Sequence, residues 1–198
     1  SDLSGVSTMY IVNMLDPEGP YFSGKYSESW MDTIVAADGY VYSTNFSSTG
    51  GSIKATDLRN LPYPTTVGSL SISGGTANDV CLSGNYAYLA AGSAGLKVVD
   101  ISNTSAPQET GSLSTTNALA VTVAADYCFL ADGSGGLQII NASDPASPSL
   151  SGSYDTSGTA SDVGVTGDYA YVADGPSGLQ VIDISDVTTP ALIKSVST

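Results

Sequence analysis

The side chains able to do chemistry in this chain are almost all carboxylates. Its 198 residues include nineteen Asp and Glu, five Lys and Arg, and no histidine. Histidine is the commonest general base and a frequent metal ligand, so a Ser-His-Asp or Cys-His site is excluded within this chain. Neither a P-loop nor an HExxH sequence occurs. The chemistry left to consider is that of acidic side chains, namely cation binding or hydrolysis.

Three aspartates fall near the start of the first strand in three copies of an internal repeat: Asp32, Asp79 and Asp162. If that strand lines a central axis, these carboxylates ring one end of a channel. Ca²⁺ takes several oxygen ligands, so the three are candidate Ca²⁺ ligands. We nevertheless expect no cofactor, with Ca²⁺ as the alternative. The competing interpretation, which we favour because no DxDxDG loop occurs, is that each carboxylate caps its own turn. Asp132 and Asp174 recur at the end of the next strand, and the same two interpretations, metal ligand and turn cap, apply to them.

Enzyme chemistry has little support. The glycine-rich segment at 133–136 has no helix after it, so it does not make a phosphate cradle. Paired carboxylates are the machinery of glycoside hydrolases, and an acidic-residue hydrolase stays open as an alternative that rests on fold analogy alone. We therefore expect a protein without catalytic residues.

Two cysteines and three Asn-X-Ser/Thr triplets carry the remaining chemistry. Cys81 and Cys128 lie in successive repeats, and a disulfide and a pair of buried thiols are equally open. The triplets at Asn45, Asn103 and Asn141 are candidate glycosylation sites, although a chain rich in Ser and Thr produces such triplets by chance.

An internal sequence repeat determines where these side chains lie in the fold. Gly95, Gly136 and Gly178 are 41 and 42 residues apart, and Pro107, Pro148 and Pro190 have the same spacings. The chain divides as one domain into a half repeat over 1–30 and four full repeats over about 31–75, 76–117, 118–159 and 160–198.

Each full repeat holds four short β runs separated by turns, and no segment has a helical apolar period. Pro190 heads the fourth run, which places that run at a sheet edge. Four antiparallel strands repeated every 40 to 45 residues are typical of a β-propeller. We predict an all-β propeller of four-stranded antiparallel blades, about four full blades plus a half blade.

Two segments resemble the LVIVD repeat: GLQVIDIS at 178–185 and DYAYVADG at 168–175. The resemblance covers residues 9–198, is clearest in the last three copies, and weakens at Ala55-Thr56-Asp57. That family occurs in bacterial and archaeal secreted and surface proteins and is taken to form propellers. The resemblance therefore implies a propeller fold, a location outside the cell or at its surface, and no enzyme activity.

Charge and aromatic residues indicate the kind of partner. A net charge of −14 repels nucleic acid and anionic lipid, and no apolar run approaches the length of a membrane span. Tyrosines that recur with the repeat, such as Tyr88 and Tyr171, are expected to pack between blades. The aromatic residues outside the repeat pattern are candidates for a contact surface: Tyr10, Tyr21, Tyr26, Trp30 and Tyr63.

The strand count predicts an unusual closure. The N-terminal half repeat supplies a third and a fourth strand, but no C-terminal segment supplies the first two. Three explanations are open: a fragment of a longer protein, a half blade that covers a four-bladed ring, or completion by a neighbouring chain in a dimer or filament. We expect a noncatalytic extracellular structural or interaction module that self-associates or joins a surface assembly. A Ca²⁺- or carbohydrate-binding propeller is the alternative.

Overall fold

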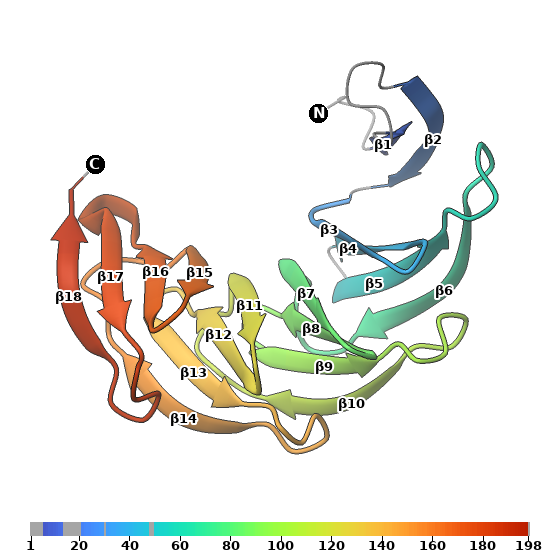
Figure 1. The fold of residues 1–198 in the computed structure, drawn as a ribbon. Coiled ribbons are helices and arrows are strands. Elements are labelled where there is room, and N and C mark those ends of the chain that lie inside the picture. The colour runs from blue at the N-terminus through green and yellow to red at the C-terminus, as the bar shows by residue number, and fades with distance from the viewer. Residues whose placement is uncertain (1–5, 14–20, 30, 48–49, 198) are drawn as a thin grey trace.

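A computed structural model describes residues 6–13, 21–29, 31–47 and 50–197 (Figure 1). The described chain folds into four separate four-stranded antiparallel sheets and one two-stranded sheet. In each four-stranded sheet the strands follow one another in chain order, as in a propeller blade. The prediction of an all-β propeller fold with four full blades and a half blade is confirmed.

The blades are numbered in chain order. The half blade is β1 (Val6–Asn13) and β2 (Tyr21–Ser29). The first blade is β3 (Ile34–Ala37), β4 (Tyr40–Ser47), β5 (Gly50–Asp57) and β6 (Thr65–Ile72). The second is β7 (Asp79–Ser83), β8 (Tyr86–Ala90), β9 (Leu96–Asp100) and β10 (Gln108–Leu113). The third is β11 (Ala120–Ala124), β12 (Tyr127–Ala131), β13 (Leu137–Asn141) and β14 (Ser149–Tyr154). The fourth is β15 (Asp162–Thr166), β16 (Tyr169–Ala173), β17 (Leu179–Asp183) and β18 (Ala191–Val196), with a short 3₁₀ turn at Gly175–Ser177.

The blades stand side by side along an arc (Figure 1). The first strands β3, β7, β11 and β15 lie on the concave side, and the fourth strands β6, β10, β14 and β18 lie on the convex side. The half blade lies beyond the first blade at one end of the arc, and the fourth blade forms the other end. The four full blades therefore do not close into a ring among themselves.

Three apolar clusters, one between each pair of successive full blades, make the core. Ile53 of the first blade packs with Leu89 of the second, Leu96 with Leu130 of the third, and Ile139 with Ile182 of the fourth. Alternation of side chains along each strand sends one apolar set toward the blade before and one toward the blade after. A single sheet cannot cover both of its faces, so each blade depends on its neighbours.

The half blade has the register of the third and fourth strands of a full blade, as the repeat predicts. Ile11 pairs with Gly24 and Val12 with Phe22, with a bulge between them. Ile139 pairs with Gly152 and Ile140 with Leu150 around the same bulge in the third blade. Within the described ranges, no helix has the length and apolarity needed to cross a membrane.

Candidate functional site

The aspartates predicted as cation ligands lie at the axial end of the blades, where the first strands begin. A cavity of about 500 Å³ opens there, lined by Asp32, Thr76, Asn78, Asn117 and Leu119. The Asn78 side-chain amide donates to the carbonyl of Ala118 at 2.8 Å, so the amide ties the second blade to the third.

Asp32 is not equivalent to the other two aspartates. The N–H of Asp32 donates to Thr44, and the N–H of Asn78 makes the matching bond to Ala90, so Asp32 aligns with Asn78. Asp79 is one residue further along its strand. Since successive side chains of a strand point to opposite faces, a one-residue offset separates Asp32 from the positions of Asp79 and Asp162.

Asp79 joins two blades. Its carboxylate accepts the N–H of Val80 at 2.8 Å and the N–H of Val121, on β11 of the next blade, at 3.0 Å. Burial raises the pKa of Asp79 above its ordinary value, and the bonds from Val121 and Val80 oppose that rise. Asp162 accepts the N–H of Val163 at 2.8 Å in the same way, but on the last blade of the arc. The part of the chain that the structure describes holds no group of three Asp, Glu, Cys or His suited to a metal ion.

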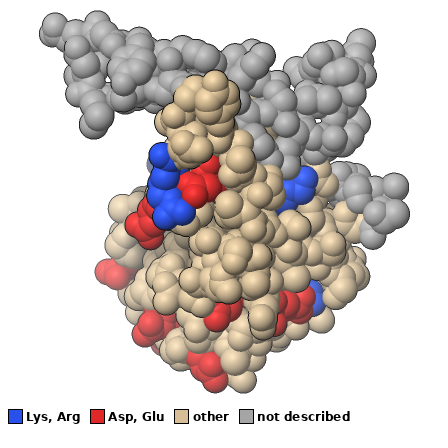
Figure 2. Space-filling view, turned by 90° about the vertical axis from the view of Figure 1, so that its right-hand side faces the viewer, with Lys and Arg blue, Asp and Glu red and all other residues tan. Residues whose placement is uncertain are grey.

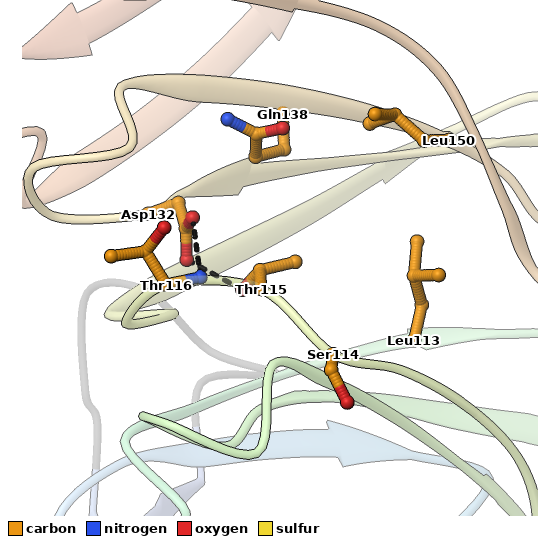
Figure 3. Close-up of a pocket in the computed structure, with 7 residues that line it drawn as sticks. All are labelled: Leu113, Ser114, Thr115, Thr116, Asp132, Gln138 and Leu150. Atoms are coloured by element: carbon orange, nitrogen blue, oxygen red, sulfur yellow. Dashed lines mark hydrogen bonds between the residues drawn. The ribbon is translucent and has the colours of Figure 1, made fainter.

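Asp132 is a buried acceptor beside a second cavity of about 380 Å³ (Figure 3). Only 1% of Asp132 is exposed, and its carboxylate accepts the hydroxyl of Thr115 at 2.5 Å and the N–H groups of Thr116 and Asn117 at 2.9 and 2.8 Å. The three donors lie in the loop that enters the third blade from the second. The turn-capping interpretation is therefore right about the acceptor role, but the donors come 15 to 17 residues earlier in the chain instead of from the residue's own turn.

Asp174 repeats this arrangement one blade later. Its buried carboxylate accepts the Thr156 hydroxyl at 2.7 Å and the Gly158 N–H at 2.9 Å. Two of the five aspartates singled out above thus hold the loops that join blades. Their oxygens are committed to structure, which leaves the nearby cavity lined mainly by Ser, Thr, Gln and Leu side chains.

Two of the candidate glycosylation sites are turn residues. The side-chain oxygen of Asn141 accepts the N–H and hydroxyl of Ser143 at 2.9 and 2.7 Å, and Asn103 binds Ser105 in the same manner. Asp183, in the position of Asn141, accepts the Ser185 N–H at 2.9 Å. In these two triplets the Asn therefore has a structural role, because its side-chain oxygen is the acceptor of an Asx turn. Asn45 lies within β4, paired with Ser52.

The two cysteines meet between the second and third blades as free thiols. Cys128 is buried in the apolar cluster there, and Cys81, on β7, is half-buried against the same cluster. Burial raises the pKa of Cys128 to about 12 and raises that of Cys81 as well. Of the two options left open by the sequence, the structure has the pair of thiols, and at neutral pH neither has the thiolate character of a reactive cysteine.

The predicted aromatic contact surface is described only at Tyr63, of which 74% is exposed. Tyr10, Tyr21 and Tyr26 lie on β1 and β2, whose side chains at these positions fall outside the description, and Trp30 lies outside the described residues. Figure 2 shows one side of the molecule, on which acidic side chains are scattered among uncharged ones and basic side chains are few.

A second exposed surface was missed by sequence reasoning. Tyr171 on β16 is 38% exposed, whereas Tyr88, at the same place in the second blade, is 4% exposed. Strand pairing puts Tyr171 beside Val181, and Leu179 beside Val196. We call the surface formed by Tyr169, Tyr171, Leu179, Val181 and Val196 the fourth-blade face. Its residue types match the buried set of the other blades, so the repeat pattern alone does not reveal its exposure.

The family model of the LVIVD repeat matches the chain three times, over residues 74–115, 117–156 and 157–198. No curated protein matches the sequence.

Among solved structures, the crystal structure of the computationally designed Ika8 protein is similar, with a TM-score of 0.66 at 13% identity over 82% of this chain and 48% of that one. That of the computationally designed Ika4 protein has a TM-score of 0.63 at 12% identity, over 76% of this chain and 89% of that one. The present chain thus spans about half the length of the Ika8 chain. At such identities the likeness is one of fold alone.

Proposed function

Because the chain belongs to the LVIVD repeat family, we propose that it is a noncatalytic structural or interaction module that works outside the cell or at its surface. The aspartates that sequence reasoning offered for chemistry support the noncatalytic part, since Asp79, Asp132 and Asp174 are committed to bonds between blades and loops. The secreted and surface proteins of the family support the location.

The observation that carries the interaction role is the fourth-blade face. In the second blade the matching residues Tyr88, Leu96 and Val98 are almost fully buried against the third blade. On the fourth blade, their equivalents Leu179 and Val181 are half-buried and Tyr171 is 38% exposed. The neighbouring Tyr169 and Val196 are 43% and 41% exposed. A contiguous apolar patch of this kind marks a contact with another macromolecule, because leaving it in water forfeits the gain from burial.

A protein surface, in the first instance a second copy of the chain, is the proposed partner. Tyrosines with aliphatic neighbours are typical of the centre of protein interfaces, where aromatic residues are enriched and charges are depleted. A net charge of −14 makes copies repel one another at long range. The fourth-blade face is more balanced than the molecule as a whole, because Lys194 lies opposite Val181 and Asp183 lies opposite Tyr169 on it.

The mass of the protein in solution tests the proposal. The chain is expected to self-associate as its concentration rises, and Tyr171→Lys is expected to abolish this by placing a charge in the contact. Leu150→Lys is the matched control, since Leu150 is 54% exposed on β14 of the third blade and is not part of the fourth-blade face. A parent chain that stays monomeric at its highest soluble concentration, or a Leu150→Lys variant as impaired as Tyr171→Lys, would contradict it.

The location has its own test. Intact cells of the source organism are treated with a protease that does not cross membranes, and the chain is followed by antibody. Loss of the chain from intact cells, with a cytoplasmic protein left whole, supports a surface location. Protection of the chain until the cells are broken argues against it.

A further inference from the structure

The outer strands of the first three blades share a glycine that the fourth blade lacks. Each outer strand has a bulge, and the pairing beyond the bulge gives every blade one equivalent position. That position is Gly68 (opposite Ala55) in β6, Gly111 (opposite Val98) in β10, Gly152 (opposite Ile139) in β14, and Lys194 (opposite Val181) in β18.

The three glycines are needed for space. A Cβ on Gly68 would lie 2.0 Å from the carbonyl oxygen of Thr104, and a Cβ on Gly152 would lie 2.2 Å from that of Val187. Both carbonyls belong to the loop between the third and fourth strands of the following blade, and Gly111 meets the equivalent carbonyl of Pro145 at 2.1 Å. Real Cβ atoms do not approach other heavy atoms within 3.0 Å. None of the three has a positive φ, so backbone conformation does not require glycine here.

The half blade obeys the same rule. Gly24 of β2 pairs with Ile11 just beyond the bulge, which is the position of Gly152 relative to Ile139. β2 is the outer strand that precedes the first blade. Glycine therefore occupies this position in all four outer strands that another blade follows, and Lys194 occupies it in the outer strand at the end of the arc.

We propose that Lys194 is a stop for blade stacking, which prevents any further blade from packing on the fourth one in the geometry that the repeat uses elsewhere. The obstacle is the Cβ of Lys194, because it would meet a backbone carbonyl, which shifts less readily than the end of a flexible side chain. Its ammonium group adds a second cost, since a covering loop would remove it from water.

Three other positions of the fourth blade have residues that are compatible with stacking. Tyr171 matches Tyr88, Leu179 matches Leu96, and Asp162 keeps the carboxylate with which Asp79 binds the next blade. It follows that the half blade of a second copy does not stack on the fourth blade as a continuation of the repeat. A head-to-tail filament of that kind is disfavoured, and self-association through the fourth-blade face needs another geometry, such as a twofold contact. The stop itself does not depend on self-association.

A repeat added to the full chain tests the stop. A second copy of residues 157–198 joined directly after Thr198 keeps the repeat spacing, because Val196 corresponds to Tyr154 in the pairing of the third blade. The fusion is made with Lys194 retained, with K194G and with K194A, and amide hydrogen exchange is measured across the added strands.

With K194G, exchange in the added repeat is expected to slow by roughly tenfold or more relative to the Lys194 fusion, because only glycine lets the new blade stack. K194A is expected to behave like Lys194, since a Cβ alone is the obstacle, and K194A behaving like K194G would overturn the steric account. Equal protection of the added repeat in the Lys194 and K194G fusions, whether high or low, would overturn the stop. Neither result bears on whether the parent chain self-associates.

Discussion

At the scale of single residues, the carboxylates of this protein act mainly as acceptors for the backbone. Asp132 and Asp174 each hold a loop that enters their blade, and Asp79 binds the first strand of the next blade. If such a carboxylate is removed, its N–H and O–H donors lose their partners in a place that water reaches poorly.

Asp132→Ala is expected to destabilise the protein by roughly 3 kcal/mol, because it leaves the donors of Thr115, Thr116 and Asn117 without their acceptor. Asp132→Asn keeps one acceptor oxygen and is expected to cost less. Urea unfolding measures both, with Asp155→Ala, at an exposed position of the next blade-joining loop, as the control. An Asp132→Ala variant no less stable than the Asp155→Ala control would show that the loop does not depend on this carboxylate.

The turn aspartates predict a loss of stability in acid. Hydrogen bonds from Ser102 and Ser185 lower the pKa of Asp100 and Asp183, and Arg59 lowers that of Asp57 from 3.8 to about 2. A pKa lowered by folding stabilises the fold above the unfolded value, near 3.8, and this contribution disappears as the pH falls through the folded value, near 2 for Asp57. The raised pKa of Asp79 acts in the opposite sense, since its protonated form favours the fold as the pH falls.

Asp183→Asn isolates one of these contributions. Asn141 holds the same turn in the third blade with an amide oxygen, so the variant keeps the turn but lacks the contribution of the charge. It is expected to be slightly less stable than the parent protein at pH 7 and to lose less stability between pH 4 and pH 2. Thermal unfolding across that range measures the difference, and Asp183→Ala, which has no acceptor, is expected to melt lower at every pH. Parallel pH profiles for Asp183→Asn and the parent would contradict the assignment.

At the scale of strands and turns, the sequence predicts most of what the structure has. The repeat spacing located the strands of all four blades, because tight turns, aromatic residues and β-branched residues recur at fixed distances. The error at Asp32 came from counting acidic residues near a strand start, whereas hydrogen bonding to Thr44 aligns Asp32 with Asn78. Partners distant in the chain, such as Val121 for Asp79, depend on how blades stack, and no local pattern states that.

The hairpin turn at Ala125 offers a test at this scale. Ala125 has a φ of 51°, in the region that favours glycine, and Gly84 and Gly167 occupy the matching turns with φ of 56° and 58°. Ala125→Gly is expected to stabilise the protein by about 0.5 to 1 kcal/mol, because it removes left-handed strain that exceeds the entropy cost of glycine. Ala124→Gly, one residue earlier in β11, is the control and is expected to destabilise. A decrease in melting temperature for Ala125→Gly would contradict the turn geometry.

At the scale of the whole molecule, each blade is stabilised by its contacts with the neighbouring blades. Each sheet covers one face of the next, so an end blade is held from one side only, and the fourth blade meets the rest of the chain through the cluster that contains Ile139 and Ile182. The repeat predicts that the blades stack. It does not predict which blade face stays uncovered, because Tyr171 and Leu179 have the same residue types as Tyr88 and Leu96, which are buried between blades. Lys194 is the position at which the last blade differs.

Gly152→Ala is expected to release the fourth blade while leaving the first two in place. Its new Cβ would lie 2.2 Å from the carbonyl of Val187 at the junction of the third and fourth blades, so hydrogen exchange should rise in β15–β18 and stay slow in β7–β9. Gly164→Ala is the matched control, since Gly164 also lies in a strand without a positive φ and a Cβ there meets nothing within 4 Å. Protection of β15–β18 as in the parent chain would mean that the loop at Val187 yields to a methyl group. The close approach of blades would then place no demand for glycine on the outer strand, and the difference at Lys194 would lose its physical basis.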